Sequence, residues 1–237
     1  MTALTSTADG SADAIVTVPP GGAGTAWVTD ALRVLKPGGH LVTFGGDSWH
    51  RLAVAVEDAG FEVRDSIAAL TATGFSPVIL ARKPLVGTVA ANVLAHGTGA
   101  LNIDATRVGT SGGTARDGRA TEPSPTGWSN MRGHGVAPLD KGRWPTNVVL
   151  DPVVAAALDE QSGTLAAGNR PSVRNVDENR TAYGEFGGQA GLPSERMDSG
   201  GASRFFPVHS SRADLLAWLT RLVTPAGGTV LDPFADS

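Results

Sequence analysis

The segment Ala31-Leu32-Arg33-Val34-Leu35-Lys36-Pro37-Gly38-Gly39-His40-Leu41 carries the chain from a helix into a strand. Apolar residues recur at helical spacing from Trp27 onward, and the Lys-Pro-Gly-Gly run at 36–39 is typical of a helix end. Residues 41–44 then predict a strand. A helix that leads directly into a strand indicates an α/β protein.

The same alternation of short strands and amphipathic helices extends over residues 12–83. A further helix, capped by Asp47 or Ser48, is expected to end at Gly60. The simplest arrangement is a mainly parallel sheet with crossover helices. Four strands are predicted in this part of the chain, at 14–18, 41–44, 61–67 and 78–82.

The end of the sequence predicts one more helix and one more strand. Residues 211–223 place leucines and Trp218 on one side of a helix, and the turn at 225–228 leads into a buried strand at 230–234. A glycine-rich turn and a helix whose N–H groups meet a ligand normally follow such a strand.

Several motifs resemble the DNA amino-methyltransferases, which methylate the exocyclic amino group of adenine or cytosine, in the branch whose catalytic motif comes first. The resemblance, to a truncated and degenerate member of phage or actinobacterial type, implies an α/β fold: an incomplete S-adenosylmethionine (SAM) methyltransferase sheet, Rossmann-like, with a long loop-rich insertion. The motifs are Asp-Ala-Ile-Val-Thr-Val-Pro-Pro at 13–20, the segment at 31–41, Glu-Asp-Ala-Gly-Phe-Glu at 57–62 and Val-Leu-Asp-Pro-Phe at 230–234.

The resemblance divides the chain into three parts. Residues 1–86 correspond to the first part of the methyltransferase-like core, and 204–237 to its last part, which ends at the cofactor-loop strand. Residues 87–203, rich in glycine, proline, serine and asparagine, resemble a target-recognition insertion, with one helix expected at 153–161. In the family a long stretch separates a strand ending near Gly74 from one beginning near Pro77, so a substrate-facing insertion is expected to be missing here.

The catalytic loop of the family is Asp-Pro-Pro-Tyr, and Val18-Pro19-Pro20-Gly21 occupies its place. Methylation of an amino group needs an acceptor that orients the extruded base and a ring on which the base stacks. Val18 accepts no hydrogen bond and Gly21 offers no ring, so these four residues are expected to be vestigial. The loss of one such acceptor costs about 3–4 kcal/mol of transition-state stabilisation. Trp27 could replace the ring, but its helical spacing with leucines predicts a core position.

The cofactor loop of the family is Asp-Pro-Phe-x-Gly-Ser-Gly, and the sequence from Asp232, Pro233 and Phe234 to its last residue departs from it. Asp236 stands where a glycine is expected, and a loop ending at Ser237 would be incomplete. These residues are expected to be vestigial too, so no cofactor is expected. His209-Ser210-Ser211-Arg212 stands in place of a His-Pro-Thr-x-Lys-Pro loop that helps the family to hold SAM.

No metal site is predicted. The sequence has no cysteine, and its histidines, expected in loops or at the surface, show no metal-ligand spacing. They are residues 40, 50, 96, 134 and 209.

The net charge and the hydropathy limit the expected partners and location of the chain, namely DNA, a membrane or the cytoplasm. A net charge of −4 disfavours DNA, although a local arginine face keeps DNA binding possible. No apolar run approaches the roughly 20 residues that a membrane span needs, and residues 1–10 do not resemble a signal peptide. A cytoplasmic protein is expected, in the host-cell cytoplasm if a phage encodes it.

Three functions remain open at this stage. The first is a catalytically inactive, phage-encoded binding module directed at a host protein of replication or restriction. Its partner, a host or phage protein or a second copy, would add to the sheet edge at Thr229, Val230 and Leu231. The alternative is an active SAM-dependent DNA amino-methyltransferase completed by another subunit. The third is a DNA-binding protein without catalysis.

Overall fold

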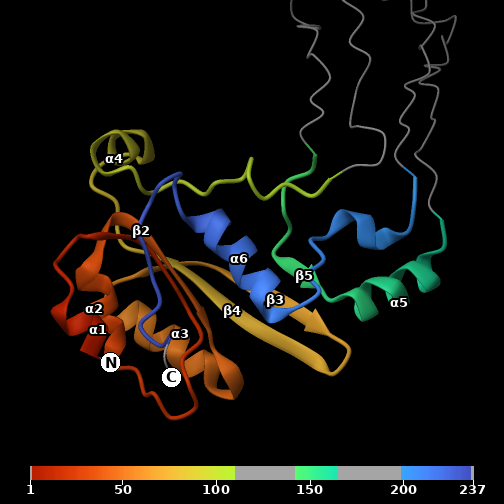
Figure 1. The fold of residues 1–237 in the computed structure, drawn as a ribbon, viewed down its shortest axis with the longest axis horizontal. Helices are drawn as coiled ribbons and strands as arrows, with labels where there is room; N and C mark the ends of the chain where they lie inside the picture. Colours follow the sequence, from red (N-terminus) through yellow and green to blue (C-terminus); the bar gives the residue numbers. More distant parts are fainter. Residues whose placement is uncertain (1, 110–141, 165–198, 236–237) are drawn as a thin grey trace, which may run out of the picture.

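A six-stranded sheet forms the centre of the molecule (Figure 1). The computed structural model describes residues 2–109, 142–164 and 199–235, and the sheet order within them is β5-β3-β4-β2-β1-β6. The α/β class is therefore confirmed. The strands are β1 (Ala12–Thr17), β2 (Leu35–Phe44), β3 (Glu62–Thr71), β4 (Gly74–Arg82), β5 (Val148–Leu150) and β6 (Val230–Leu231).

Four of the six described α-helices were predicted from sequence periodicity. The helix α4 was missed inside a segment interpreted as loops, although Thr88 caps it and Gly97 ends it with a φ of 76°. The short α1 was also missed. The helices are α1 (Thr2–Ser6), α2 (Trp27–Val34), α3 (Trp49–Asp58), α4 (Val89–His96), α5 (Pro152–Ser162) and α6 (Arg212–Val223).

The prediction of a mainly parallel arrangement is wrong for the strands of the first part. Only β1 and β2 are parallel neighbours there, whereas β4 runs antiparallel to both β2 and β3. The reason is the connection from Thr71 to Gly74. Its two intervening residues suffice for a hairpin, while a parallel crossover needs a dozen or more.

The same hairpin corrects the expected strand boundary between Gly74 and Pro77. Gly74 and Phe75 do not end a strand, because they open β4 and pair with Thr71 and Leu70 of β3. Residues 62–82 therefore form one continuous antiparallel pair.

Two apolar layers cover the two faces of the sheet. On one face, α2 and α3 pack against β1, β2 and β4 around Ile15, Leu41 and Ile79. On the other face, α6 packs through Trp218 and Leu219. Trp27 belongs to the first layer, with 2% of its surface exposed and its ring edge-on to Phe234 at 5.5 Å between centroids, so its expected core position is confirmed.

The segment 87–203 contributes to this sheet. β5 pairs in parallel with β3 through Ala68–Val148, Ala69–Val149 and Leu70–Leu150. The helix expected at 153–161 follows as α5. The loops predicted at 109–135 and 169–201 lie almost entirely outside the described residues, as do His134, Asp236 and Ser237.

Candidate functional site

All strands of the described sheet except β4 have their carboxyl ends at the same edge. β1, β2 and β6 run parallel, β3 and β5 share their direction, and β4 alone is reversed. Ligands of open α/β sheets generally bind beyond the carboxyl ends of the strands. The predicted catalytic loop and the predicted cofactor loop both follow strands that end at this edge.

The predicted catalytic loop follows β1. The side chain of Val18 is half-buried against the apolar layer under α6. Pro20 turns the chain by accepting a hydrogen bond from Ala23 N at 3.1 Å, and Gly21 faces open space. Val18-Pro19-Pro20-Gly21 thus presents neither a side-chain acceptor nor an aromatic ring.

The predicted cofactor loop follows β6 and is tied to β1. Asp232 Oδ1 accepts hydrogen bonds from Thr17 Oγ1 at 2.5 Å and from Phe234 N at 3.0 Å. Pro233 and Phe234 are buried. The structure therefore brings the two loops together, but it engages their distinctive residues in packing and internal hydrogen bonds.

These residues do not fit the requirements of amine methylation. That reaction needs an oxygen free to accept from the amino group and a surface that stacks the base. Among the described residues of the two loops, Asp232 carries the only carboxylate. Its Oδ1 accepts two hydrogen bonds from within the fold, and it follows β6, whereas Val18 stands at the acceptor position of the predicted catalytic loop. No step through SAM follows from this arrangement.

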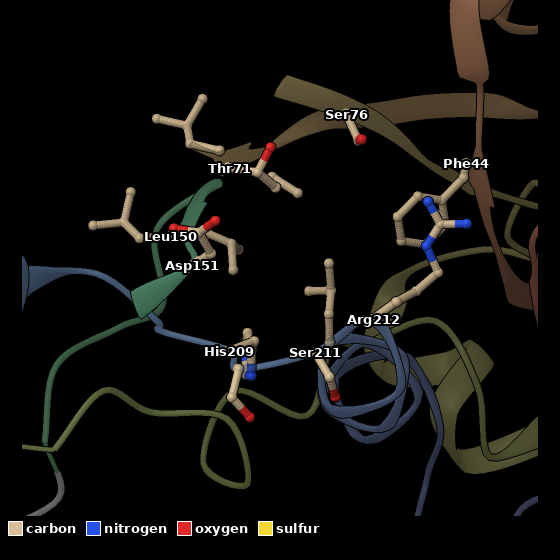
Figure 2. A pocket seen from close by; sticks show the side chains of 13 residues that line it. Phe44, Thr71, Ser76, Leu150, Asp151, His209, Ser211 and Arg212 are labelled. Carbon is tan, nitrogen blue, oxygen red and sulfur yellow. The ribbon is translucent and has the colours of Figure 1, made fainter. Parts of the chain in front are cut away.

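A separate pocket of about 220 Å³ opens at the same edge (Figure 2). It lies among the ends of β2, β3 and β5, the start of β4 and the first turn of α6. Apolar side chains form much of its wall, and charged or polar groups stand around it. Its lining residues are Phe44, Ala69, Leu70, Thr71, Ser76, Val149, Leu150, Asp151, His209, Ser210, Ser211, Arg212 and Leu215.

His209 closes one side of the pocket. Its backbone N–H donates to Leu150 O at 2.9 Å, and its Nδ1 lies 3.3 Å from Asp214 Oδ2. Burial lowers the pKa of His209, outweighing the raising effect of Asp214, so the imidazole is neutral at pH 7. The side chain is 10% exposed, and its buried Nε2 has no hydrogen-bond partner among the described residues.

Arg212 lies on another wall, at the first position of α6. Its guanidinium stands over the ring of Phe44, 5.5 Å from the centroid. The side chain of Ser211 accepts from Asp214 N at 3.1 Å and caps the helix. Hydrogen bonding from Ser210 N lowers the pKa of Asp214, which keeps this carboxylate ionised.

Asp151 lies across the pocket from Arg212 (Figure 2). One of its carboxylate oxygens accepts from Val154 N at 2.7 Å and caps α5, and the other accepts from Ala72 N at 3.0 Å. The carboxylate thus ties the β3–β4 hairpin to α5.

This pocket was not predicted from the sequence. Residues 209–212 were noted only as an altered loop, and the loops at Val18 and Asp232 were expected to be vestigial. Neither Val18 nor Asp232 lines the cavity. A local signal existed at Asp151, because an aspartate followed by proline is typical of a helix start. Nothing local placed it opposite Arg212.

The expected surface position of His40 is wrong. This histidine lies in β2 beside Arg82 of β4 and is 3% exposed. Burial, assisted by the charges of Arg82 and Arg64, lowers its pKa to about 4. A histidine surrounded by apolar strand residues is as compatible with a buried position as with a loop, and the strand began earlier than predicted.

The third site suggested by the sequence is the outer strand β6. Thr229 is exposed, and Val230 and Leu231 are half-buried. The strand pairs with β1 on one side, and it is the last in the sheet order of the described residues.

Two features are absent from the described residues. No helix among them has the length and apolarity needed to cross a membrane. Nor do three or more potential metal-ligating side chains gather within residues 2–109, 142–164 and 199–235.

Comparisons with known proteins find likeness only among solved structures. No protein-family model matches the sequence. No curated protein matches it either.

The similar structures include DNA modification methylases and SAM-dependent methyltransferases. A Thermus thermophilus protein described as a DNA modification methylase is 18% identical, with a TM-score of 0.32, over 37% of this chain and 52% of that one. M1.HpyAVI in complex with SAM is 23% identical, with a TM-score of 0.29, over 31% and 45%. A SAM-dependent methyltransferase from Methanosarcina mazei is 21% identical, with a TM-score of 0.28, over 34% and 63%. The matches span about half the length of the first two, and at these scores they transfer no activity to this chain.

Proposed function

We propose that this chain is a catalytically inactive binding module built on a methyltransferase-like α/β scaffold. Its function is to pair with another protein through the outer edge of β6, and its partner is a host or phage protein or a second copy of the chain. The phage origin and a host target in replication or restriction are parts of the same proposal. They rest on the sequence resemblance alone.

The main support for an inactive protein is the way in which the two loops at the carboxyl ends of the strands are packed and hydrogen-bonded. Asp232 is bonded to Thr17, Phe234 is buried against Trp27, and Val18 packs into an apolar layer. In the described part of the two loops the scaffold residues therefore keep their packing, while Val18 and Gly21 provide neither the acceptor nor the ring that amine methylation requires. This combination supports a role for the folded shape without the chemistry.

The direction of the backbone groups supports pairing at β6. Thr229 N donates to Asp13 Oδ2 at 2.8 Å, and Thr229 O accepts from Asp13 N at 3.0 Å and Ala14 N at 3.2 Å, so both groups point toward β1. Because successive residues of a strand turn these groups to opposite sides, those of Val230 point away from β1. An exposed strand edge with such groups is a template for another strand.

The variants Val230→Pro and Val230→Thr test this edge. Proline removes the outward N–H, whereas threonine keeps it and closely matches the shape of valine. Sedimentation velocity of the purified chain measures pairing with a second copy, and copurification with candidate phage or host proteins measures pairing with another partner. We expect association of the wild type and of Val230→Thr, and its loss in Val230→Pro.

Two results contradict the pairing proposal. One is equal association of Val230→Pro and the wild type. The other is a wild type that stays monomeric and binds no candidate partner. Circular dichroism melting of each variant serves as the control, because it separates a lost interface from a lost fold.

A second candidate function is an active SAM-dependent DNA amino-methyltransferase completed by another subunit. The observation in its favour is the position of Thr17 and Asp232 at the carboxyl ends of adjacent parallel strands, where open α/β sheets bind ligands. This function requires methyl transfer to DNA in the presence of the second subunit. DNA binding without catalysis is disfavoured by the net charge of −4 and predicts a steep salt dependence.

A further inference from the structure

A second pocket, of about 300 Å³, lies on the face of the sheet that α6 covers. No residue lines both this pocket and the one in Figure 2. Leu80, Leu101 and Ile103 form its apolar wall. Its charged lining residues are Arg64 of β3 and Arg82 of β4, and no acidic residue of the described chain lines it. The pocket therefore suits an anionic ligand.

A β-bulge places Arg64 at this pocket. The register of β3 and β4 joins Val63 to Ala81 and Asp65 to Leu80. Arg64 is therefore an extra residue between two paired ones. Such bulges redirect a side chain, and they are common next to functional sites. The side chain of Arg64 is 54% exposed and donates no hydrogen bond within the described residues.

Arg64 and Arg82 converge on a single oxygen, Glu62 Oε2. Arg82 donates to it through Nη2 at 2.5 Å and Nε at 3.1 Å, whereas Arg64 Nη1 lies 3.9 Å away. One carboxylate thus stands against two guanidinium groups, and the donors of Arg64 can serve another anion. Burial is the main cause of the low pKa of His40, another lining residue, and the charges of Arg82 and Arg64 lower it further. The positive field of both arginines therefore reaches the pocket.

Trp144 provides an open aromatic surface at the same pocket. It belongs to the segment before β5, and it is 68% exposed. The guanidinium of Arg107 lies 5.9 Å from the centroid of its ring, and no other aromatic ring of the described residues packs against it. A flat ligand can stack on this indole, while Leu101 and Ile103 supply further apolar surface.

We propose that this pocket binds a planar aromatic acid with a ring system about the size of naphthalene, whose anionic group is a carboxylate or a phosphate. The anionic group pairs with Arg64 and Arg82, because guanidinium groups bind both oxyanions through paired donors. The rings stack on Trp144. The volume of about 300 Å³ lies at the lower end of the range for ligand pockets, which favours a ligand of this size. This site is separate from the β6 edge and does not depend on protein pairing there.

Calorimetric titration of the full chain with 2-naphthoate and 2-naphthyl phosphate tests the site, and the tighter of the two identifies the anionic group. Two matched ligands each lack one feature. They are 2-naphthylmethanol, which keeps the rings without the charge, and decahydro-2-naphthoate, which keeps the charge without flat rings. We expect an aromatic acid to bind and both matched ligands to bind roughly ten- to hundredfold more weakly, because one loses charged hydrogen bonds and the other loses the stack.

The variants Arg64→Gln and Trp144→Leu test the two features from the side of the protein. Each should weaken binding of the aromatic acid roughly tenfold or more. Arg51→Gln and Phe75→Leu are the matched controls, since both residues are exposed and neither lines this pocket. The controls should bind as the wild type does. Melting curves verify that each variant is folded.

Three results overturn the proposal: no binding of either aromatic acid, equal binding of one of the matched ligands, or unchanged affinity in folded Arg64→Gln or Trp144→Leu. Each of them leaves association through β6 intact. A single-stranded oligonucleotide serves as a competitor. If it binds this pocket more tightly than both acids, the surface belongs to nucleic acid and the assignment to a small aromatic acid is wrong.

Discussion

At the scale of single residues, His40 couples the stability of the fold to pH. Its folded pKa is about 4, compared with 6.5 for the free side chain, because burial and two arginines disfavour the charged form. Above pH 6.5 the imidazole is neutral in both states. As the pH falls below 6.5, the unfolded chain binds a proton that the folded chain does not bind. The free energy of unfolding therefore decreases as the pH falls toward 4.

The expected loss through His40 is about 2 kcal/mol between pH 6.5 and 5, because each pH unit is worth about 1.4 kcal/mol in this window. Urea unfolding at pH 7.5 and pH 5 measures it. The variant His40→Gln removes the titrating group. Between these two pH values its free energy of unfolding should therefore fall by about 2 kcal/mol less than that of the wild type. An equal fall in both proteins would show that His40 is not responsible.

At the scale of an element, α4 shows how a short helix is fixed to the sheet. The side chain of Asn92 is fully buried, and its amide donates to Pro37 O at 2.9 Å and Thr98 O at 2.8 Å, while its oxygen accepts from Val86 N at 2.9 Å. Leucine at this position fills similar space but leaves buried polar groups unsatisfied.

The substitution Asn92→Leu should lower the free energy of unfolding by about 2–4 kcal/mol, since each unsatisfied buried group costs about 1–3 kcal/mol. Thr88→Ala, in the same helix, removes only the cap to Ala91 N and should cost about 1 kcal/mol. Chemical denaturation of both variants makes the comparison. A cost for Asn92→Leu no larger than that for Thr88→Ala would refute the anchoring role.

Some of the helices and strands could be predicted from the sequence, and others could not. Periodicity identified α2, α3, α5 and α6, because each has an apolar side and three of them a recognisable cap or stop residue. It did not give the direction of β4, which depends on the two-residue turn after Thr71. It also did not find α4, whose exposed Leu94 and buried Asn92 contradict the usual pattern.

At the scale of the whole molecule, the functional residues come from distant parts of the chain. Thr17 and Asp232 are 215 residues apart, and the pocket joins Phe44, Asp151 and Arg212. The sequence located the two altered loops because their motifs are local. It could not locate the pocket, since only the sheet order brings its walls together.

The described residues form two packed layers around the sheet, while Val18 and Gly21 stand where amine methylation would need an acceptor and a stacking ring. Scaffold and chemistry are thus separate properties of this chain. The proposed binding through the β6 edge uses the scaffold and does not require methyl transfer.

The most direct measurement is transfer of a tritiated methyl group from SAM to unmethylated DNA by the purified chain, with an active amino-methyltransferase as the positive control. Circular dichroism must first show that the chain is folded. We predict no radioactivity in the DNA above that in a reaction without protein. Incorporation that depends on the chain, and that is lost on substitution of Asp232 by asparagine, would contradict the inactive function.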